Sequence, residues 1–337
     1  MTHELEVWLF SDRVGTLALV DGRLGFCYTA SWLSRPNAVA LSHSLPLRTE
    51  PFDDRTTRPF FAGLLPEGQM RRLIARQFQV SGQNDFALLD RIGGECAGAV
   101  TFLAPGQSLP TPEQTGGVLW LRDEDVVAVL DELPRRPMLA GKDGLRLSLA
   151  GAQDKLPVVF DGTRLGLPLN GTPSSHILKP PIDAVEDSVV NEGFCMALAE
   201  ALQLKPAMAS VHAVLNRPFL LVERYDRVLD AQGCRQRLHQ EDFCQALGVV
   251  PEMKYQNEGR PDLVKGPARR RMLELANSLP RAARALQSDR THGFAGNGVV
   301  ERIVALIEQR CALTLRKLSA PLSAPTSRDG DSSASPQ

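Results

Sequence analysis

The sequence predicts an α+β protein with more than one domain, and three observations lead to that prediction. Apolar and polar residues alternate through much of residues 5–30, a pattern typical of short strands joined by tight turns. Apolar residues recur at helical spacing across 60–80 and 188–204. The 337 residues suffice for two or three cores. We expect a mixed N-terminal domain, a second strand-rich lobe and C-terminal helices.

Turn and cap residues set the elements of the N-terminal part. Asp21-Gly22 marks a hairpin, and Pro66-Glu67-Gly68 breaks the helical pattern of 60–80. Asn84 suits the start of a further helix, which the pair Gly93-Gly94 ends. Elements predicted here are strands at 5–9, 14–20 and 99–103, and helices at 60–80, 85–92 and 123–133.

The later part contains a second set of strands and then long helices. The predicted strands are 145–149, 157–160, 176–179, 211–215 and 219–222, and the predicted helices are 188–204, one from 243, 269–286 and 299–318. Residues 216–218 suit the turn of a hairpin, and 104–118, rich in Pro and Gly, suit a linker. The expected domains are 1–125, 126–265 and 266–318, with a disordered tail at 319–337.

Composition narrows the class of protein. The formal net charge is −1, so no global field favours nucleic acid or a membrane. The six cysteines form no C-x-x-C pair, which argues against zinc and suits reduced thiols. The first residues lack the cationic region of a signal peptide, and no apolar run approaches the ~18 residues of a membrane span. We expect a cytoplasmic protein without a membrane partner.

A small-residue loop lies in LRLSLAGAQDKLPVVF, residues 145–160. Ala150, Gly151 and Ala152 stand between two predicted strands, where small residues let backbone N–H groups approach an anion. A tight hairpin explains the same phrase, and for a loop with one glycine it is the commoner interpretation. The phrase alone does not decide between them.

A lysine and a glutamate follow that loop. Lys179 ends the strand in SSHILKPP, where its ammonium group could contact nucleotide phosphates. It could equally be a surface lysine with a packed stem. Glu192, early in the next helix, could pair with Lys179, as kinase folds require. A carboxylate near a helix N-terminus is also favourable without any such role.

The fourth phrase is FLLVERYD, residues 219–226. An apolar strand that stops at charged residues suits a hinge whose backbone groups read an adenine edge, although many surface strands end this way. Loop, lysine strand, glutamate helix and hinge strand follow one another as in the N-lobe of a protein kinase. Their order carries more information than any single phrase.

These phrases together resemble the HipA family of bacterial toxin serine/threonine kinases. The similar phrases are SLAGAQDK, SHILKPP, VNEGFCMALA, LVERYDR, HQEDFCQALG and KYQNEG, with VGTLAL, FFAGLLPEG and DFALLDRIGGECAGAV nearer the N-terminus. The resemblance runs almost continuously as far as Lys265, and residues 270–318 resemble the C-terminal helices of the family. It implies an α+β fold with a kinase-like N-lobe.

The resemblance also implies a site that binds ATP with Mg²⁺. It places Gly151, Ala152 and Gln153 in the phosphate-covering loop and Lys179, paired with Glu192, on the phosphates. The residues that it places at the adenine hinge are Glu223 and Tyr225. Ser148 falls where family members carry a serine that phosphorylates itself, displacing the loop and closing off ATP binding.

Partners are implied in the same way. The family pairs with a small helix-turn-helix antitoxin of the HipB type, which brings the complex to operator DNA. Family substrates include an aminoacyl-tRNA synthetase, and the family is associated with persistence. These partners are what the resemblance implies for this chain.

The sequence departs from the family where catalysis occurs. Phosphoryl transfer needs a positioned carboxylate and metal-binding Asp and Asn residues, which the family carries in a D-x-H-x-K-N loop and a later Y-D or F-D phrase. Here residues 254–265 run directly into the helix of 266–280, so the join at Lys265-Gly266 resembles an internal deletion. Asp289, His292 and Asn297 imitate such a loop, but we predict a surface connection between helices there.

The function predicted from this pattern is a degenerate HipA-type toxin that keeps ATP and antitoxin binding and transfers little or no phosphate, so its use of Mg²⁺ is doubtful. One alternative is an active kinase with unrecognised catalytic residues or a lobe supplied by another chain. The other is a non-enzymatic module that binds antitoxin or operator. Without the catalytic lobe, the hinge strand and the helix from Phe243 should expose apolar faces.

Overall fold

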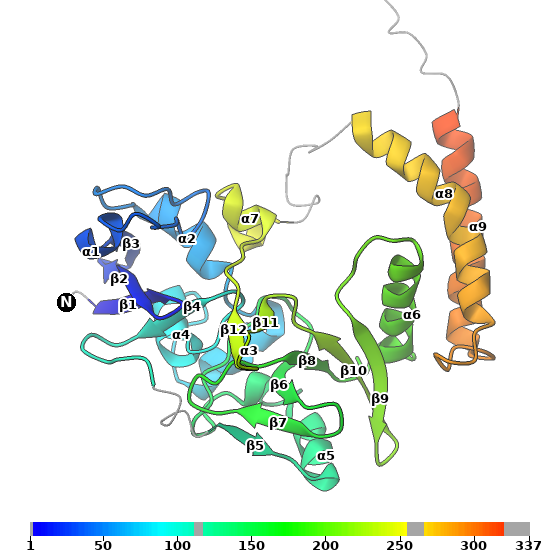
Figure 1. Cartoon of the computed structure of the whole chain (residues 1–337), viewed down its shortest axis with the longest axis horizontal. Helices are drawn as coiled ribbons and strands as arrows, with labels where there is room; N and C mark the ends of the chain where they lie inside the picture. The colour runs from blue at the N-terminus through cyan, green and yellow to red at the C-terminus, as the bar shows by residue number, and fades with distance from the viewer. Residues whose placement is uncertain (1–2, 111–116, 255–265, 320–337) are drawn as a thin grey trace, which may run out of the picture. The chain divides into compact units, whose positions relative to one another are not determined.

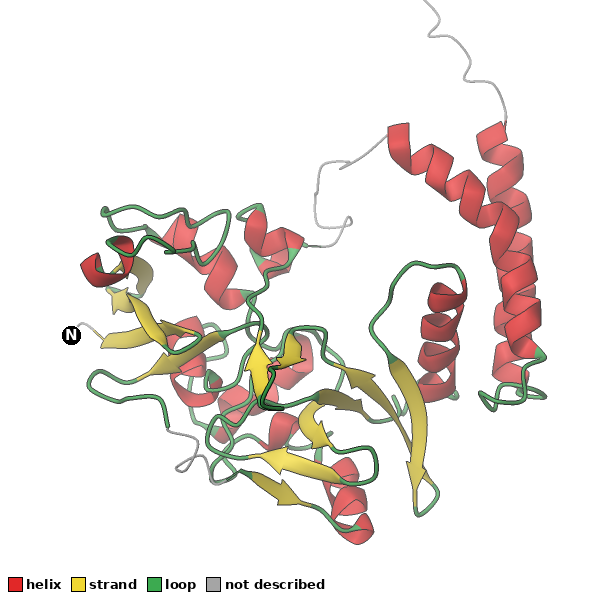
Figure 2. Ribbon diagram, in the orientation of Figure 1, coloured by secondary structure: helices red, strands yellow, loops and turns green. Residues whose placement is uncertain are grey.

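The computed structural model describes residues 3–110, 117–254 and 266–319 (Figure 1). These residues fall into two compact units, one formed by residues up to 197 together with 205–254, the other by 198–204 together with 266–319. The two larger sheets of the first unit are antiparallel and lie beside helices, as the yellow and red ribbons of Figure 2 show. The α+β class is confirmed, while the domain boundaries proposed above stay a prediction.

The first sheet consists of β1 (His3–Leu9), β2 (Asp12–Val20), β3 (Arg23–Tyr28) and β4 (Val100–Leu103), in the order β3-β2-β1-β4. The predicted turn at Asp21-Gly22 is confirmed, with φ of 50° and 78°. Such left-handed pairs match the twist of a hairpin. The helices α1 (Ala30–Leu33), α2 (Asp54–Ala62), α3 (Gly68–Gln77) and α4 (Asp85–Ile92) accompany this sheet. The shared core contains many aromatic residues, among them Phe26, Phe60, Phe61 and Phe102.

The helix boundaries follow the local signals. The break at Pro66-Glu67-Gly68 is confirmed: Glu67 is extended, and Gly68 has a φ of 55°. Asn84 caps α4 through a hydrogen bond that its Oδ1 accepts from the Ala87 amide at 2.9 Å. The helix before the break begins earlier than predicted, at Asp54, because Asp53 caps it by accepting from the Thr56 amide at 3.0 Å.

The second sheet has the strand order β5-β7-β6-β8-β10-β9. Its strands are β5 (Val118–Trp120), β6 (Leu156–Phe160), β7 (Leu165–Pro168), β8 (His176–Lys179), β9 (Ala209–Val214) and β10 (Arg217–Glu223). Leu156, Leu178 and Leu221 share a core with α5 (Asp123–Glu132) and the 3-10 turn η1 (Pro137–Leu139). On the other side, Val189 of α6 (Ser188–Ala201) packs with Leu220 and Val222.

The prediction of a strand at 145–149 is wrong. This segment forms only one isolated parallel bridge, between Leu147 and Glu95, and β6 pairs with β7 and β8 instead. The hairpin interpretation of 145–160 is therefore wrong as well. Leu145, Leu147 and Leu149 are all buried, which produces the alternation of a strand without a ladder. The turn before β10 lies at Leu215-Asn216, one residue earlier than predicted, because these two residues take the left-handed φ values of 47° and 63°.

The polypeptide after β10 forms β11 (Arg227–Leu229), β12 (Arg235–Arg237), α7 (Phe243–Ala246) and η2 (Pro251–Met253). The expected apolar exposure is present on α7, where Phe243 is 82% exposed. The prediction of apolar exposure is wrong for the hinge strand β10. Its residues Phe219–Val222 are buried because the strand is covered on both faces.

The second unit contains α8 (Gly266–Gln287) and α9 (Gly298–Ser319). Arg284 of α8 forms an ion pair with Glu308 of α9. The predicted surface connection at 288–297 is confirmed: Asp289 accepts from Thr291, and Asn297 accepts from the Val299 and Val300 amides at 2.9 and 3.1 Å at the start of α9. Lys265 and the predicted tail beyond Ser319 lie outside the described residues. Within the described ranges, no helix is long and apolar enough to cross a membrane.

Candidate functional site

Lys179 and Glu192 meet beside the second sheet. Lys179 is the last residue of β8 and pairs in register with Leu220 of β10, and Glu192 lies on α6. The Nζ atom of Lys179 forms an ion pair with Oε1 of Glu192, and 21% and 30% of the two side chains are exposed. The structure thus brings together the two residues that the sequence left with competing interpretations. A lysine held in this way presents its ammonium group in one direction.

The loop of Gly151, Ala152 and Gln153 closes over a second lysine. The side chain of Lys155, 9% exposed, folds back so that Nζ donates to the carbonyl oxygen of Ala150 at 2.5 Å. Gly151 has a φ of +104°, and a Cβ atom there would lie 2.6 Å from Lys155 Nζ. Only glycine fits this position. Lys155 was not singled out from the sequence, although the phrase SLAGAQDK ends on it.

Opposing effects act on the pKa of Lys155. Burial lowers the pKa of Lys155 to about 8, and the positive charges of Lys179 and Lys254 act in the same direction. The carboxylates of Glu67 and Glu192 oppose that change. Three ammonium groups therefore act together close to the glycine loop, and an arriving anion would relieve their repulsion.

The segment between α2 and α3 holds the loop from outside. The Glu67 amide donates to the carbonyl oxygen of Gly151 at 3.1 Å, and Pro66 forms a parallel bridge with Gly151. Lys254 donates to Oε1 of Glu67 at 2.5 Å. Sequence reasoning missed Glu67 and Lys254, because they lie far along the chain from the loop.

Ser148 is placed before the same loop but is not accessible. Its side chain is fully buried, and its Oγ donates to the carbonyl oxygen of Leu64 at 2.8 Å. Its amide donates to the carbonyl oxygen of Glu95 at 2.9 Å. A kinase could reach this hydroxyl only after the segment moves away from Leu64.

Exposed and buried residues alternate at the end of β10 and just after it. Glu223 ends the strand and is exposed, and Tyr225 is 72% exposed. Arg224 and Asp226 are buried, and they form a bidentate pair in which Nε donates to Oδ1 at 2.9 Å and Nη2 to Oδ2 at 2.7 Å. Such a pair fixes the path of the backbone.

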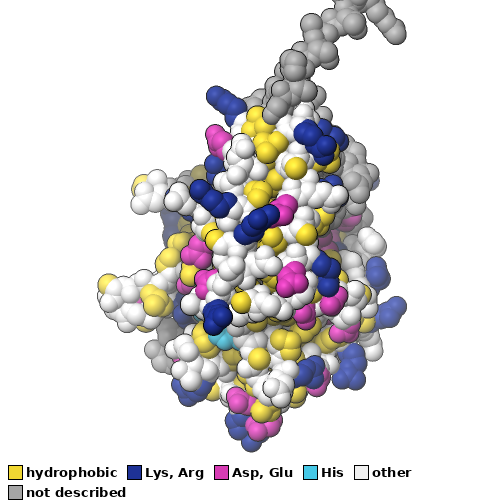
Figure 3. Space-filling view, turned by 90° about the vertical axis from the view of Figure 1, so that its right-hand side faces the viewer, with side chains coloured by type: hydrophobic (Ala, Val, Ile, Leu, Met, Phe, Trp, Pro, Cys, Tyr) yellow, Lys and Arg dark blue, Asp and Glu magenta, His cyan; other side chains and the backbone are white. Residues whose placement is uncertain are grey.

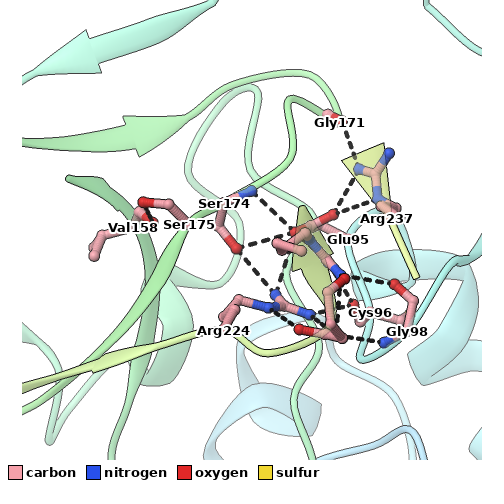
Figure 4. Close-up of polar contacts among 12 residues, drawn as sticks. Glu95, Cys96, Gly98, Val158, Gly171, Ser174, Ser175, Arg224 and Arg237 are labelled. Carbon is pink, nitrogen blue, oxygen red and sulfur yellow. Dashed lines mark hydrogen bonds and ion pairs between the residues drawn. The ribbon is translucent and has the colours of Figure 1, made fainter. Parts of the chain in front are cut away.

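Glu95 is the centre of the buried network that holds this segment (Figure 4). Its carboxylate accepts from Arg224 at 3.2 Å, from Arg227 at 2.8 Å and from Arg237 at 2.6 Å. Burial alone would raise the pKa of Glu95, but the three guanidinium groups hold it well below its usual range. This network could not be predicted from the sequence, because its charged residues look like ordinary surface residues there.

The residues around the glycine loop suit a nucleotide better than a metal ion. Partly buried ammonium groups beneath a glycine loop suit the phosphates of a nucleotide. The fit to Mg²⁺ is poor: in the part of the chain that the structure describes, no group of three or more His, Cys, Asp or Glu side chains could hold a metal ion. Burial and the charge of Asp183 raise the pKa of Asp154, the carboxyl group nearest the loop in sequence.

Comparison with known proteins identifies the family. The second sheet, with α6 beside it, defines an α+β protein with a kinase-like lobe. The sequence pattern of the HipA N-terminal domain matches residues 5–103, and that of the HipA-like C-terminal domain matches residues 147–294. The chain belongs to the HipA family.

Individual relatives support this assignment. Y4mE of Sinorhizobium fredii, whose name proposes a kinase, is 51% identical over 262 residues, which are 76% of this chain and 62% of that protein. The serine/threonine-protein kinase toxin HipA of Shewanella oneidensis is 29% identical over 283 residues, which are 82% of this chain and 63% of that toxin. The chain thus spans less than two thirds of the length of either relative.

A solved structure is similar as well. It is the complex of HipA, HipB and operator DNA from Shewanella oneidensis, which matches with a TM-score of 0.63 and 26% identity. The match covers 84% of this chain and 67% of that one.

Proposed function

We propose that this protein is a HipA-family toxin relative that binds ATP but transfers little or no phosphate. By descent it is a serine/threonine kinase. The observation that carries the proposal is the Lys179–Glu192 ion pair next to the buried ammonium group of Lys155, beneath the loop of Gly151.

The charges around the loop support nucleotide binding. Lys155 has lost much of its hydration, and among the described residues its ammonium group donates one hydrogen bond, to the neutral carbonyl group of Ala150. A phosphate group would supply the negative charge that this ammonium group lacks. Lys179, already oriented by Glu192, would contact the same phosphates. The exposed edge at Glu223 and Tyr225, fixed from behind by Arg224 and Asp226, would receive the adenine ring.

The residues available for chemistry argue against efficient transfer. The sequence has no D-x-H-x-K-N loop between Lys265 and the last helices. The residues that imitate one are engaged locally, since Asp289 closes a turn with Thr291 and Asn297 caps α9. A transferring kinase needs a base for the substrate hydroxyl and carboxylates for Mg²⁺. We infer that a bound nucleotide is neither hydrolysed nor used to phosphorylate a substrate.

Partners follow from the structural neighbour, which is a complex with HipB and operator DNA. We propose that this chain binds a helix-turn-helix antitoxin of the HipB type and reaches operator DNA through it. A protein substrate such as an aminoacyl-tRNA synthetase belongs to the alternative in which the chain keeps kinase activity, with Ser148 as a second phosphate acceptor.

Thermal unfolding with and without ATP tests the binding. A ligand at about 100 times its Kd stabilises a protein by roughly 2.7 kcal/mol, so ATP should raise the Tm measurably. Lys179→Ala should abolish the rise, while Lys317→Ala, an exposed lysine on α9, should leave it unchanged. No rise with the unaltered chain would refute the proposal.

Labelled ATP with Mg²⁺ tests the transfer. We expect no label on the chain or on an added protein. Label that appears on the unaltered chain and is lost with Ser148→Ala would establish the active-kinase alternative instead.

A further inference from the structure

A concave site is formed by residues other than those around the glycine loop. This hollow of about 1380 Å³ is lined by the turn between β1 and β2, the loops at 103–110, 141–146 and 170–173, and β12. None of the residues assigned above to nucleotide binding lines it. Its volume exceeds the roughly 300–1,000 Å³ of ordinary small-molecule sites, so it can hold an extended ligand.

The lining is strongly cationic for a chain with a net charge of −1. Among the described residues, its basic side chains are Arg91, Lys142, Arg146, Arg235 and Arg237, and its acidic ones are Asp90 and Asp143. By contrast, the face drawn in Figure 3 mixes basic, acidic and apolar side chains. The basic side chains of this lining outnumber the acidic ones, so the hollow would attract an anion.

Arg146 is the clearest sign of an anion site. Its guanidinium group donates to the carbonyl oxygens of Asp90 at 2.7 Å and Phe102 at 3.1 Å, and within the described ranges it forms no ion pair with a carboxylate. Gly94 makes room for it, because a Cβ atom there would lie 2.8 Å from Cβ of Arg146. A fixed and partly dehydrated guanidinium group that forms no direct ion pair favours phosphate oxygens.

Arg237 lines the same hollow. Its guanidinium group lies between the Glu95 carboxylate and the carbonyl oxygen of Gly171, to which Nη2 donates at 2.7 Å (Figure 4). Two arginines that come from distant parts of the chain are therefore held in place at this wall.

An exposed aromatic ring completes the site. Phe10, in the turn between β1 and β2, lines the hollow and is 43% exposed. Its φ is +57°, in the left-handed region. A bulky residue rarely adopts this backbone conformation, and asparagine or glycine is usual in such a turn. Phe78, at the end of α3, is a second ring in the lining. Aromatic rings beside cationic side chains are the arrangement on which unpaired bases stack.

We propose that this hollow, defined by Phe10, Lys142, Arg146, Arg235 and Arg237, binds a short stretch of single-stranded nucleic acid. The arginines and Lys142 contact the phosphates, and Phe10 stacks on a base. Single strands fit because their bases are free to reach the rings, whereas duplex bases are already stacked. The proposal does not depend on ATP binding at Lys179.

Fluorescence anisotropy with labelled ten-residue oligo(dT) and oligo(U) tests it. The experiment uses the full chain carrying Lys179→Ala, so that the lysine site does not contribute. Phe10→Asn removes the ring and suits the left-handed backbone, so the variant should fold, and it should weaken binding about fivefold or more. Lys142→Gln should weaken it several-fold and reduce its salt dependence, whereas Lys317→Gln should change neither.

Further probes decide the source of the ligand. Tripolyphosphate, AMP and poly-glutamate should compete only weakly with the oligomer. The free thiol of Cys234, which lines the hollow, should react more slowly with a maleimide when the oligomer is bound. Oligomer binding that is lost on Phe10→Asn and Lys142→Gln would support the proposal. It would be overturned by no binding, by binding that ignores both variants, or by AMP or poly-glutamate binding more tightly than the oligomer.

Discussion

Glu95 and Arg237 face each other across 142 positions of sequence, and the Arg237 guanidinium group donates to Oε2 of Glu95 from Nε at 3.0 Å and from Nη2 at 2.6 Å. Glu95 also accepts from Arg224 and Arg227, and its backbone bonds to both sides of Leu147. The backbone of Glu95 therefore holds the segment before the glycine loop, and its carboxylate holds the segment after β10 and a wall of the cationic hollow.

Replacing this carboxylate should weaken the fold severely. Glu95→Gln leaves the buried Arg224 and Arg227 and the partly buried Arg237 without their shared counter-ion. The loss of one partner from a buried ion pair costs about 3–5 kcal/mol. Urea unfolding at neutral pH measures this loss. Glu50→Gln, at an exposed position, is the control and should cost little. Equal midpoints for both variants would show that the network does not stabilise the protein.

Stability should also fall on acidification. The folded-state pKa of Glu95 is lowered, so its contribution is complete above the ordinary glutamate pKa of about 4.3 and is lost as the pH falls below that value toward the folded-state pKa. Unfolding free energies between pH 3 and 7 should show this slope. In Glu95→Gln the slope should be shallower, and an identical slope would contradict the assignment to Glu95.

Binding of ATP should weaken as the pH rises through about 8. Lys155 binds phosphate only when charged, and its pKa is about 8 in the folded chain. Calorimetric titration at pH 7 and pH 9.5 measures the change. Lys155→Arg keeps its charge throughout, so its affinity should depend less on pH if the larger side chain is accommodated. A pH dependence unchanged by Lys155→Arg would exclude Lys155 as its source.

Gly151→Ala should disturb the loop more than a matched substitution does. Both Gly151 and Gly162 have left-handed φ values, +104° and +98°, but a Cβ atom meets Lys155 Nζ at 2.6 Å in the first and nothing within 4 Å in the second. Gly151→Ala and Gly162→Ala should both introduce backbone strain of about 1–3 kcal/mol. Only Gly151→Ala should also displace Lys155 and abolish the ATP-dependent rise in Tm. Equal ATP responses would show that the contact with Lys155 does not matter.

Removal of the Ser148 hydroxyl should cost about 1–3 kcal/mol, because the buried carbonyl group of Leu64 then loses its partner. Chemical unfolding of Ser148→Ala measures this cost. A variant as stable as the unaltered chain would indicate that the segment already leaves Leu64 in solution.

The exposed face of α7 should promote self-association. Phe243 is 82% exposed and Leu247 is 54% exposed, so both present apolar surface to water. Phe243→Ser should reduce light scattering and dye binding with little loss of stability. Phe219→Ser, which changes a buried ring of β10, should instead lower the unfolding midpoint sharply. Scattering unaffected by Phe243→Ser would show that α7 is not the associating surface.

The predictions that succeeded are those in which neighbouring residues decide the outcome. The cap at Asn84, the turn at Asp21-Gly22, the bounds of β8 and the Lys179 position at its end all follow from a few adjacent side chains. The strand predicted at 145–149 failed because burial alone produced its alternation, and only a ladder partner could have distinguished the two cases.

The amino-acid sequence alone determined the α+β class, most element boundaries and the order of loop, lysine strand and glutamate helix, since local backbone preferences and periodicity set them. Only the tertiary structure decided that Lys155 lies under its own loop, that Ser148 is buried against Leu64, and that Glu95 joins three arginines. Charged residues look alike in a sequence wherever they lie. Burial and the pairing of distant side chains give each of them its energy and its role.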